Sequence, residues 1–215
     1  FAKDVLPYII PLVCILTATD DENDLYKMLC AIKVNSDLLN IFNSQCEIWW
    51  NKSDLIDLIK DIVSKFFNKN SSAYNISIQF KMSMKSLIDQ PKELLELIND
   101  CLKPKDKEKK EYGEVFTPME IVDEMLDVLP KAVWKDKNLK WFDPAAGMGN
   151  FPIAVYLRLM KGLKNVIVND ASRKRHIIEN MLYMCELNKK NALVCKQIFD
   201  INDKYKMNLY KGNTL

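Results

Sequence analysis

The stretch Trp141-Phe-Asp-Pro-Ala-Ala-Gly-Met-Gly-Asn-Phe151 holds two of the five glycines in this 215-residue chain, Gly147 and Gly149. They follow Asp143, which ends a short apolar run at 139–142, and a helical pattern begins at Phe151. Glycine lets a backbone approach a ligand closely, and the start of a helix offers unpaired N–H groups. Since ligands of open α/β sheets lie at the carboxyl ends of the strands, the stretch predicts a strand, a ligand-binding turn and a helix.

The neighbours of the two glycines indicate which ligand the turn would hold. The dinucleotide pattern Gly-x-Gly-x-x-Gly would need a third glycine where Pro152 stands, and no phosphate-loop Gly-Lys-Ser/Thr follows. Asp143 would be a poor neighbour for phosphate but a good one for a cationic amine. A nucleoside that carries an amino acid therefore fits the turn better than a pyrophosphate.

The rest of the second half predicts an α/β fold with a parallel sheet. A helix at 151–160 and a short strand at 207–211 join the first strand in an alternating order that is typical of βαβ units. A nucleoside also needs an acid for its ribose hydroxyls, usually at the end of the next strand, and two compete. A strand at 165–169 would end beside Asp170, whereas a strand at 181–186 would end at Glu186. The second arrangement leaves 189–199 as a regular crossover helix, so we favour Glu186 and keep Asp170 as the alternative.

Residues 1–102 contain no glycine and predict an all-helical domain. Apolar residues recur at intervals of three and four in four segments, with Ser53 suited to cap the third helix and Pro91 suited to begin the fourth. The segments are 24–34, 37–50, 53–67 and 91–102. The stretch 76–87 is ambiguous between strand and helix. The charged run at 103–112 predicts a linker, and 113–215 forms the second domain.

The motifs of the second domain resemble those of S-adenosylmethionine-dependent DNA adenine-N6 methyltransferases, as in type I and type IIG modification enzymes. Asp143-Pro-Ala-Ala-Gly-Met-Gly-Asn-Phe151 resembles motif I, and Gly113-Glu-Val-Phe-Thr-Pro118 resembles the element that precedes it. The segment from Leu182 to Asn191 resembles motif II, with Glu186 as its acid. The resemblance implies a Rossmann-like methyltransferase sheet. The segment 195–200 and the composition also look like homologues encoded by large DNA viruses.

The element before motif I also has a local interpretation. Thr117 could cap a helix that begins at Pro118, with Glu120 completing a capping box ahead of an apolar face. In the family this turn covers the methionine end of the cofactor, and Thr117 occupies the matching position.

The resemblance implies a set of cofactor-binding residues and no catalytic side chain. Asn213 stands where the family usually has an acid that accepts from the adenine amine, and we expect weakened rather than abolished binding. The expected set is Phe116, Thr117, Pro118, Asp143, Ala145, Ala146, Gly147, Gly149, Glu186, Leu187, Asn213 and Thr214. The family's Asp/Asn-Pro-Pro-Tyr/Phe motif, which binds the flipped target base, does not occur in this sequence. We therefore expect a fragment that is inactive alone.

Composition limits the possible partners. The net charge is only +2, so any nucleic-acid surface must be a local patch; the run at 173–175 could contact phosphate, although an exposed helix face explains it as well. Six cysteines without metal-ligand spacing argue against zinc and disulfides and for a reducing compartment, the bacterial cytoplasm or a virus-infected cell. The apolar start, 1–16, is too short to span a membrane.

The leading hypothesis is a double-stranded DNA adenine-N6 methyltransferase that flips its target base, with a possible specificity or nuclease subunit as partner. One alternative is a methyltransferase of the same superfamily that acts on RNA or protein. Another is a non-catalytic module that keeps the fold to bind DNA or a partner, which Asn213 and the missing motif would suit.

Overall fold

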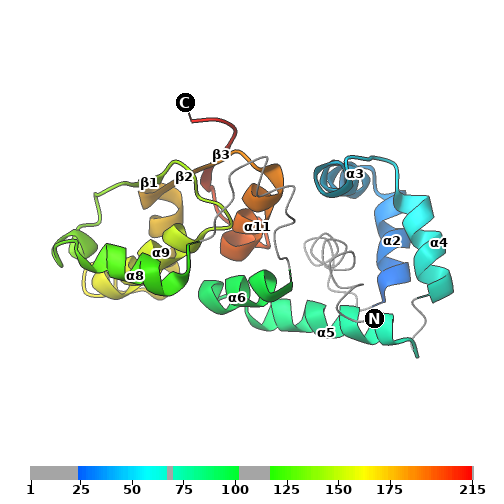
Figure 1. The fold of residues 1–215 in the computed structure, drawn as a ribbon, viewed down its shortest axis with the longest axis horizontal. Helices are drawn as coiled ribbons and strands as arrows, with labels where there is room; N and C mark the ends of the chain where they lie inside the picture. The colour runs from blue at the N-terminus through cyan, green and yellow to red at the C-terminus, as the bar shows by residue number, and fades with distance from the viewer. Residues whose placement is uncertain (1–23, 67–69, 102–116, 215) are drawn as a thin grey trace. The chain divides into compact units, whose positions relative to one another are not determined.

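The computed structural model describes residues 24–66, 70–101 and 117–214 (Figure 1). These residues cluster into two compact units, and the division falls within one helix, α6 (Pro91–Cys101). Within the described residues, the first unit contains four helices and the end of α6, and the second contains the sheet with its helices. The predicted linker at 103–112 and the predicted boundaries around it lie outside the described residues.

The first unit is helical at every element that the structure describes. Its helices are α2 (Leu25–Val34), α3 (Ser36–Trp50), α4 (Ile56–Phe66) and α5 (Ser72–Ser86). Side chains of Asp24, Asn35 and Ser71 accept backbone N–H groups and so fix three helix starts. The prediction that a helix begins at Pro91 is confirmed by α6.

One prediction for this unit is wrong, and one stretch that the sequence left ambiguous is resolved. Ser53 does not cap α4, because Asp54 takes a left-handed conformation (φ 55°) and the helix begins only at Ile56. Of the two interpretations left open for 76–87, the structure has the helix, because α5 covers nearly all of this stretch. Its buried side chains, Ser77, Phe80, Lys81 and Met84, recur at helical spacing. The alternation of apolar residues therefore did not decide the structure there.

Helices α2, α3 and α4 share one apolar core. Every apolar side chain in it comes from the inner face of its helix, and Phe42 is fully buried. The core consists of Leu25, Met28, Leu29, Ile32, Phe42, Cys46, Ile56 and Val63.

The second unit is built on three parallel strands in the order β1-β2-β3. They are β1 (Trp141–Asp143), β2 (Leu182–Glu186) and β3 (Asn208–Lys211), so the predicted strands and their parallel pairing are confirmed. Residues 165–169 form no strand, and Asp170 begins a helix instead. The structure therefore supports the choice of the strand that ends at Glu186.

The connections place two long helices on one face of this sheet. Helix α9 (Asn150–Gly162), helix α10 (Asp170–His176) and a π-helical turn, η2 (Ile177–Met181), lead from β1 to β2, and α11 (Lys189–Asp200) leads to β3. The rings of Tyr156 on α9 and Phe199 on α11 meet edge to face at 5.8 Å, so both helices cover the same face. Within the sheet, the exposed fraction is 62% for Phe142 on β1 and 63% for Tyr210 on β3.

Helix α8 (Met119–Asp127) packs against α9, where Arg158 donates to the carboxylates of Asp123 and Asp127. The predicted capping box at Thr117 is wrong, because Pro118 is the N-cap residue and no side chain caps this helix. Pro118 has an extended ψ of 146°, so the helix cannot include it. A short 3-10 turn, η1 (Val133–Lys135), follows. No helix in the described part of the chain is long and apolar enough to cross a membrane.

The helical core yields a stability prediction. Phe42→Ala should lower the free energy of unfolding by about 3 to 5 kcal/mol, because it leaves a cavity in a closed core. Ile41→Ala, at a neighbouring position that is 47% exposed, is the matched control and should cost far less. Urea unfolding followed by circular dichroism measures both. Equal losses for the two variants would contradict the assignment of the core.

Candidate functional site

The loop at the carboxyl end of β1 is a tight turn whose shape depends on its two glycines. The N–H of Ala146 donates to the carbonyl of Cys185 on β2 (2.9 Å), and the N–H of Gly149 turns back to the carbonyl of Ala146 (2.9 Å). Gly147 and Gly149 have φ values of 56° and 110°, in the region that other residues rarely adopt. The glycine spacing is therefore a requirement of the turn itself.

Gly149 is also required by the packing beneath the loop. A Cβ atom at this position would lie 3.3 Å from Sγ of Cys195, which is fully buried on α11. The thiol in turn lies 3.8 Å from Sδ of Met184 on β2. A side chain at 149 would therefore crowd the Cys195 thiol, which would have to shift by a few tenths of an ångström. Nothing in the sequence pattern singled out Cys195, because a lone buried cysteine has no distinctive spacing.

Glu186, at the end of β2, accepts backbone N–H groups from two loops. We call this pair of hydrogen bonds the Glu186 clamp. Its Oε2 accepts the N–H of Gly147 (2.7 Å), and its Oε1 accepts the N–H of Asn188 (2.7 Å). The residue is only 7% exposed, and its own carbonyl accepts the N–H of Gly212 beyond β3. A buried carboxylate needs such donors, yet each of its oxygens can accept a further hydrogen bond.

Asp143 lies at the same edge of the sheet. It pairs in register with Met184, two residues before Glu186, so both acids lie at the carboxyl ends of adjacent parallel strands. Its Oδ1 accepts the N–H of Ala145 (3.0 Å). Burial raises the pKa of Asp143 above its ordinary value, and the hydrogen bond from Ala145 only partly opposes this.

The two carboxylates act on a common neighbour. Burial, Asp143 and Glu186, in that order of size, all raise the pKa of the Cys195 thiol. The negative potential of both acids therefore extends beneath the glycine loop. No group of three or more His, Cys, Asp or Glu among the described residues could hold a metal ion.

Asn150, a residue that the sequence analysis did not select, connects the glycine loop to the segment before α8. Its Nδ2 donates to the carbonyl of Thr117 (2.8 Å) and so joins the segment before α8 to the start of α9. Asn150 is buried, and its Oδ1 has no hydrogen-bond partner within the described part of the chain. The sequence signal that could have identified Asn150 is a polar residue between Gly149 and the apolar face of α9.

The structure brings most of the expected site residues together. Thr214 donates from its hydroxyl to the carbonyl of Pro144 (3.2 Å), so the segment after β3 returns to the glycine loop. Asn213 lies between Thr214 and Gly212, whose N–H bonds to Glu186. Leu187 follows Glu186 with its side chain mostly exposed, and Pro118 precedes α8. Phe116 lies outside the described residues.

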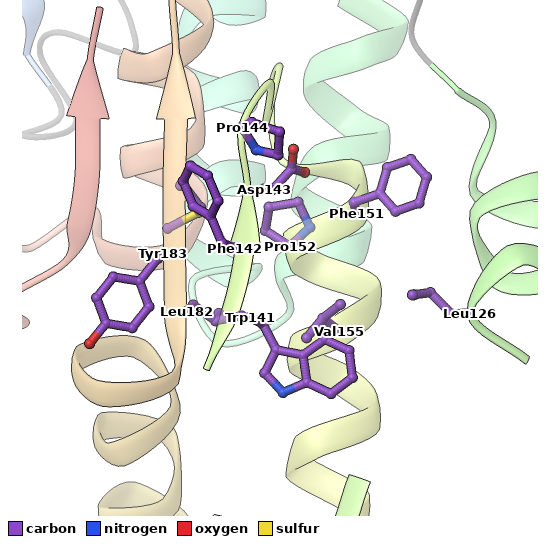
Figure 2. A pocket seen from close by; sticks show the side chains of 11 residues that line it. Leu126, Trp141, Phe142, Asp143, Pro144, Phe151, Pro152, Val155, Leu182 and Tyr183 are labelled. Atoms are coloured by element: carbon purple, nitrogen blue, oxygen red, sulfur yellow. The ribbon is translucent and has the colours of Figure 1, made fainter. Parts of the chain in front are cut away.

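A pocket of about 290 Å³ lies beside the loop rather than over it. Figure 2 shows Asp143 and Pro144 near the upper end of β1, with Phe151, Pro152 and Val155 of α9 alongside and Leu126 of α8 opposite. Of the residues expected to bind a cofactor, only Asp143 lines it. This mostly apolar hollow therefore adjoins the candidate site without being the site.

Glu186 accepts two backbone N–H groups and Asp143 accepts one, so substitution of Glu186 should destabilise the chain more than substitution of Asp143. Glu186→Gln should lower the free energy of unfolding by about 1 to 3 kcal/mol, because one of the two N–H donors would face an amide NH2 group. Asp143→Asn can keep its bond to Ala145 through the amide oxygen, so it serves as the control and should cost little. Thermal and urea unfolding measure both. A stable Glu186→Gln variant would refute the clamp.

The bond from Asn150 predicts a local effect. Asn150→Ala should speed amide hydrogen exchange at the start of α8, because the carbonyl of Thr117 loses its donor. Asn150→Asp has a similar shape without the N–H and should do the same, while Asn180→Ala, at an exposed position, should not. Exchange measured by mass spectrometry over 117–127 tests this. Unchanged exchange in both Asn150 variants would show that the bond is dispensable.

Comparisons with known proteins identify the family of the chain. A protein of Mycoplasma pneumoniae described as an "Uncharacterized adenine-specific methylase" is 34% identical over 154 residues, which cover 60% of this chain and 36% of that protein. The chain thus spans about a third of that relative's length. No solved structure matches significantly. The family model of N-6 DNA methylases matches residues 93–215, more than half of the chain, including the whole glycine loop, so the chain belongs to the N-6 DNA methylase family.

Proposed function

We propose that this chain is the S-adenosylmethionine-binding part of a DNA adenine-N6 methyltransferase with a Rossmann-like sheet. The single observation that carries the proposal is the clamp of Glu186 on Gly147, because it joins a motif I turn to a motif II acid at one edge of a parallel sheet. Membership of the N-6 DNA methylase family and the name of the Mycoplasma pneumoniae relative support the same reaction.

The side chains at this edge suit the parts of that cofactor. Glu186 can accept from the ribose hydroxyls with the lone pairs that its two backbone donors leave. Asp143 suits the positive charge of the methionine end, and Thr117, held through its carbonyl by Asn150, would line that end. Asn213 would accept from the adenine amine through its side-chain oxygen. The set contains acceptors where the ligand has donors or positive charge.

When bound, S-adenosylmethionine supplies a methyl group on a positively charged sulfur. Asp143, Glu186 and Thr117 would hold this donor for transfer of the methyl group to the adenine N6 nitrogen. The residues named here would contribute by holding the donor in line with the target nitrogen, and such alignment lowers the barrier substantially. The target would be an adenine flipped out of duplex DNA, as proposed for the whole protein.

Cofactor binding gives the direct test. Isothermal titration of the chain with S-adenosylmethionine should show one site, and Asp143→Ala and Glu186→Ala should each weaken it about tenfold to a hundredfold, as expected for lost charge-assisted contacts. Glu124→Ala removes an exposed carboxylate from α8 and is the matched control. No binding by the folded chain would overturn the proposal and favour a non-catalytic module.

The raised pKa of Asp143 gives the binding a pH dependence. Protonation removes the charge that attracts the sulfonium group, so affinity should fall on acidification, beginning at a higher pH than an ordinary aspartate would require. The stability of the free chain should change with pH in the opposite direction. Ionisation of the buried Asp143 carboxyl lowers the free energy of unfolding as the pH rises through its folded pKa. Titrations across mildly acidic pH should show the fall in affinity, and Asp143→Asn should flatten it. An identical pH profile in that variant would exclude Asp143 as its source.

A further inference from the structure

The segments that precede the three strands form a second charged surface, at the end of the sheet opposite the glycine loop. Because the strands are parallel, their amino ends lie at one edge. His176 contacts the carbonyl of Lys137 (2.9 Å), and the N–H of Lys206 donates to Glu179 (3.1 Å). These bonds join the loop before β1, the helix before β2 and the loop before β3 into one continuous surface.

This amino-end surface consists of Lys137, Lys174, Arg175, Lys204, Tyr205 and Lys206. Tyr205 lies at its centre, with Nζ of Lys174 5.6 Å and the guanidinium carbon of Arg175 5.3 Å from the centroid of its ring. Cations over an aromatic face are held in place while keeping their charge. The run at 173–175 is therefore not a uniform helix face: Arg173 is buried, whereas Lys174 and Arg175 gather around Tyr205.

The charge of this region stands out against the rest of the chain. Segments 135–140, 170–179 and 203–206 contain eight Lys and Arg residues against four Asp and Glu residues, a surplus twice the net charge of +2 for the whole chain. Three of those four acids form ion pairs. Asp170 and Glu179 pair with Arg173 and Arg175, two of the eight bases, and Asp203 pairs with Lys196 outside these segments. The positive field is thus local to this edge of the sheet.

The same surface contains a hollow of about 390 Å³. Its lining consists of Ala171, Ser172, Arg175, His176, Glu179, Asn180 and Tyr205. Hydrogen-bond donors and an aromatic ring therefore face the same space, and the acid among them, Glu179, is paired with Arg175 (2.8 Å). Donors and cations suit phosphate oxygens, and an aromatic ring suits a base that stacks on it. An acidic protein would use the cations but would have no need of the ring.

We propose that the amino-end surface binds the phosphate backbone of a polynucleotide, independently of base sequence and of the cofactor. Strand β2, five residues and about 17 Å long, separates it from the glycine loop. A DNA segment bound here is therefore distinct from the stretch that would present its base to the methyl donor. The surface would hold the chain on DNA while the target is engaged elsewhere.

The test uses the whole chain and a fluorescein-labelled duplex of about 20 base pairs, without S-adenosylmethionine. Fluorescence anisotropy over a range of salt concentrations gives the affinity and its salt dependence. The triple variant K174Q/K204Q/K206Q should bind at least about tenfold more weakly near 0.1 M salt, with the slope of log affinity against log salt reduced by about 2 to 3.

The control is K27Q/K52Q/K60Q in the helical unit. Lys60 lies 5.6 Å from the ring of Tyr26, as Lys174 does from Tyr205, and Lys27 and Lys52 match the exposure of Lys204 and Lys206. This variant removes the same charge and should retain most of the affinity. Circular dichroism confirms that both variants fold, and calorimetry with S-adenosylmethionine should give the same result for both.

Three results would overturn the proposal. They are a wild-type chain that does not bind the duplex, an amino-end variant with unchanged affinity and salt slope, and labelled polyglutamate that binds as tightly as the duplex. The last result would indicate an acidic protein as partner instead. Because the cofactor is omitted, failure here leaves the methyltransferase proposal intact, and failure of cofactor binding leaves this one intact.

Discussion

The hydrogen bond from the N–H of Gly147 to the carboxylate of Glu186 is the contact on which the candidate site depends. It joins two residues 39 positions apart in sequence, at the tips of neighbouring strands. The other carboxylate oxygen holds the start of α11 through Asn188, and the carbonyl of Glu186 holds Gly212. One buried residue thereby fixes the loops after all three strands. The small residues of the glycine loop therefore need no contacts from long side chains of their own to keep the conformation of the loop.

That constraint explains why small residues and acids occur together at this edge. Gly149 lets α9 descend onto Cys195, and Asn150 then reaches the segment before α8. Asp143 remains half-buried beside the loop, where ionisation is costly unless a cation is near. The two acids of the candidate site thus lie at the carboxyl end of the sheet, whereas the amino end carries a surplus of bases. This polarity suits a chain that would hold a cationic methyl donor at one end and a polyanion at the other.

The sequence was informative where a residue's role follows from chain topology. The choice of Glu186 over Asp170 rested on the spacing of strands and helices, and the structure has the strand that the choice required. The glycine loop was predictable because positive φ values demand glycine. The all-helical character of the described part of the first unit followed from its apolar spacing and lack of glycine.

Other features depend on contacts that no local pattern reports. Thr117 has the residue type of a cap, but the extended backbone of Pro118 starts α8 one residue later, and Asn150 binds the carbonyl of Thr117 instead. Ser53 loses its capping role to the left-handed turn at Asp54. The positions of Cys195 and Tyr205 follow only once α11 and the strands are packed, because both act on residues far away in sequence.

The most direct test of the central claim is a two-dimensional ¹H–¹⁵N NMR titration of the chain with S-adenosylmethionine. The account predicts shifts of the Gly147 and Asn188 amides, which donate to the Glu186 carboxylate, and of the Gly149 amide in the same loop. The amides of α2 to α4 should stay in place. A spectrum in which the glycine-loop amides do not move at saturating ligand, although the chain is folded, would contradict it.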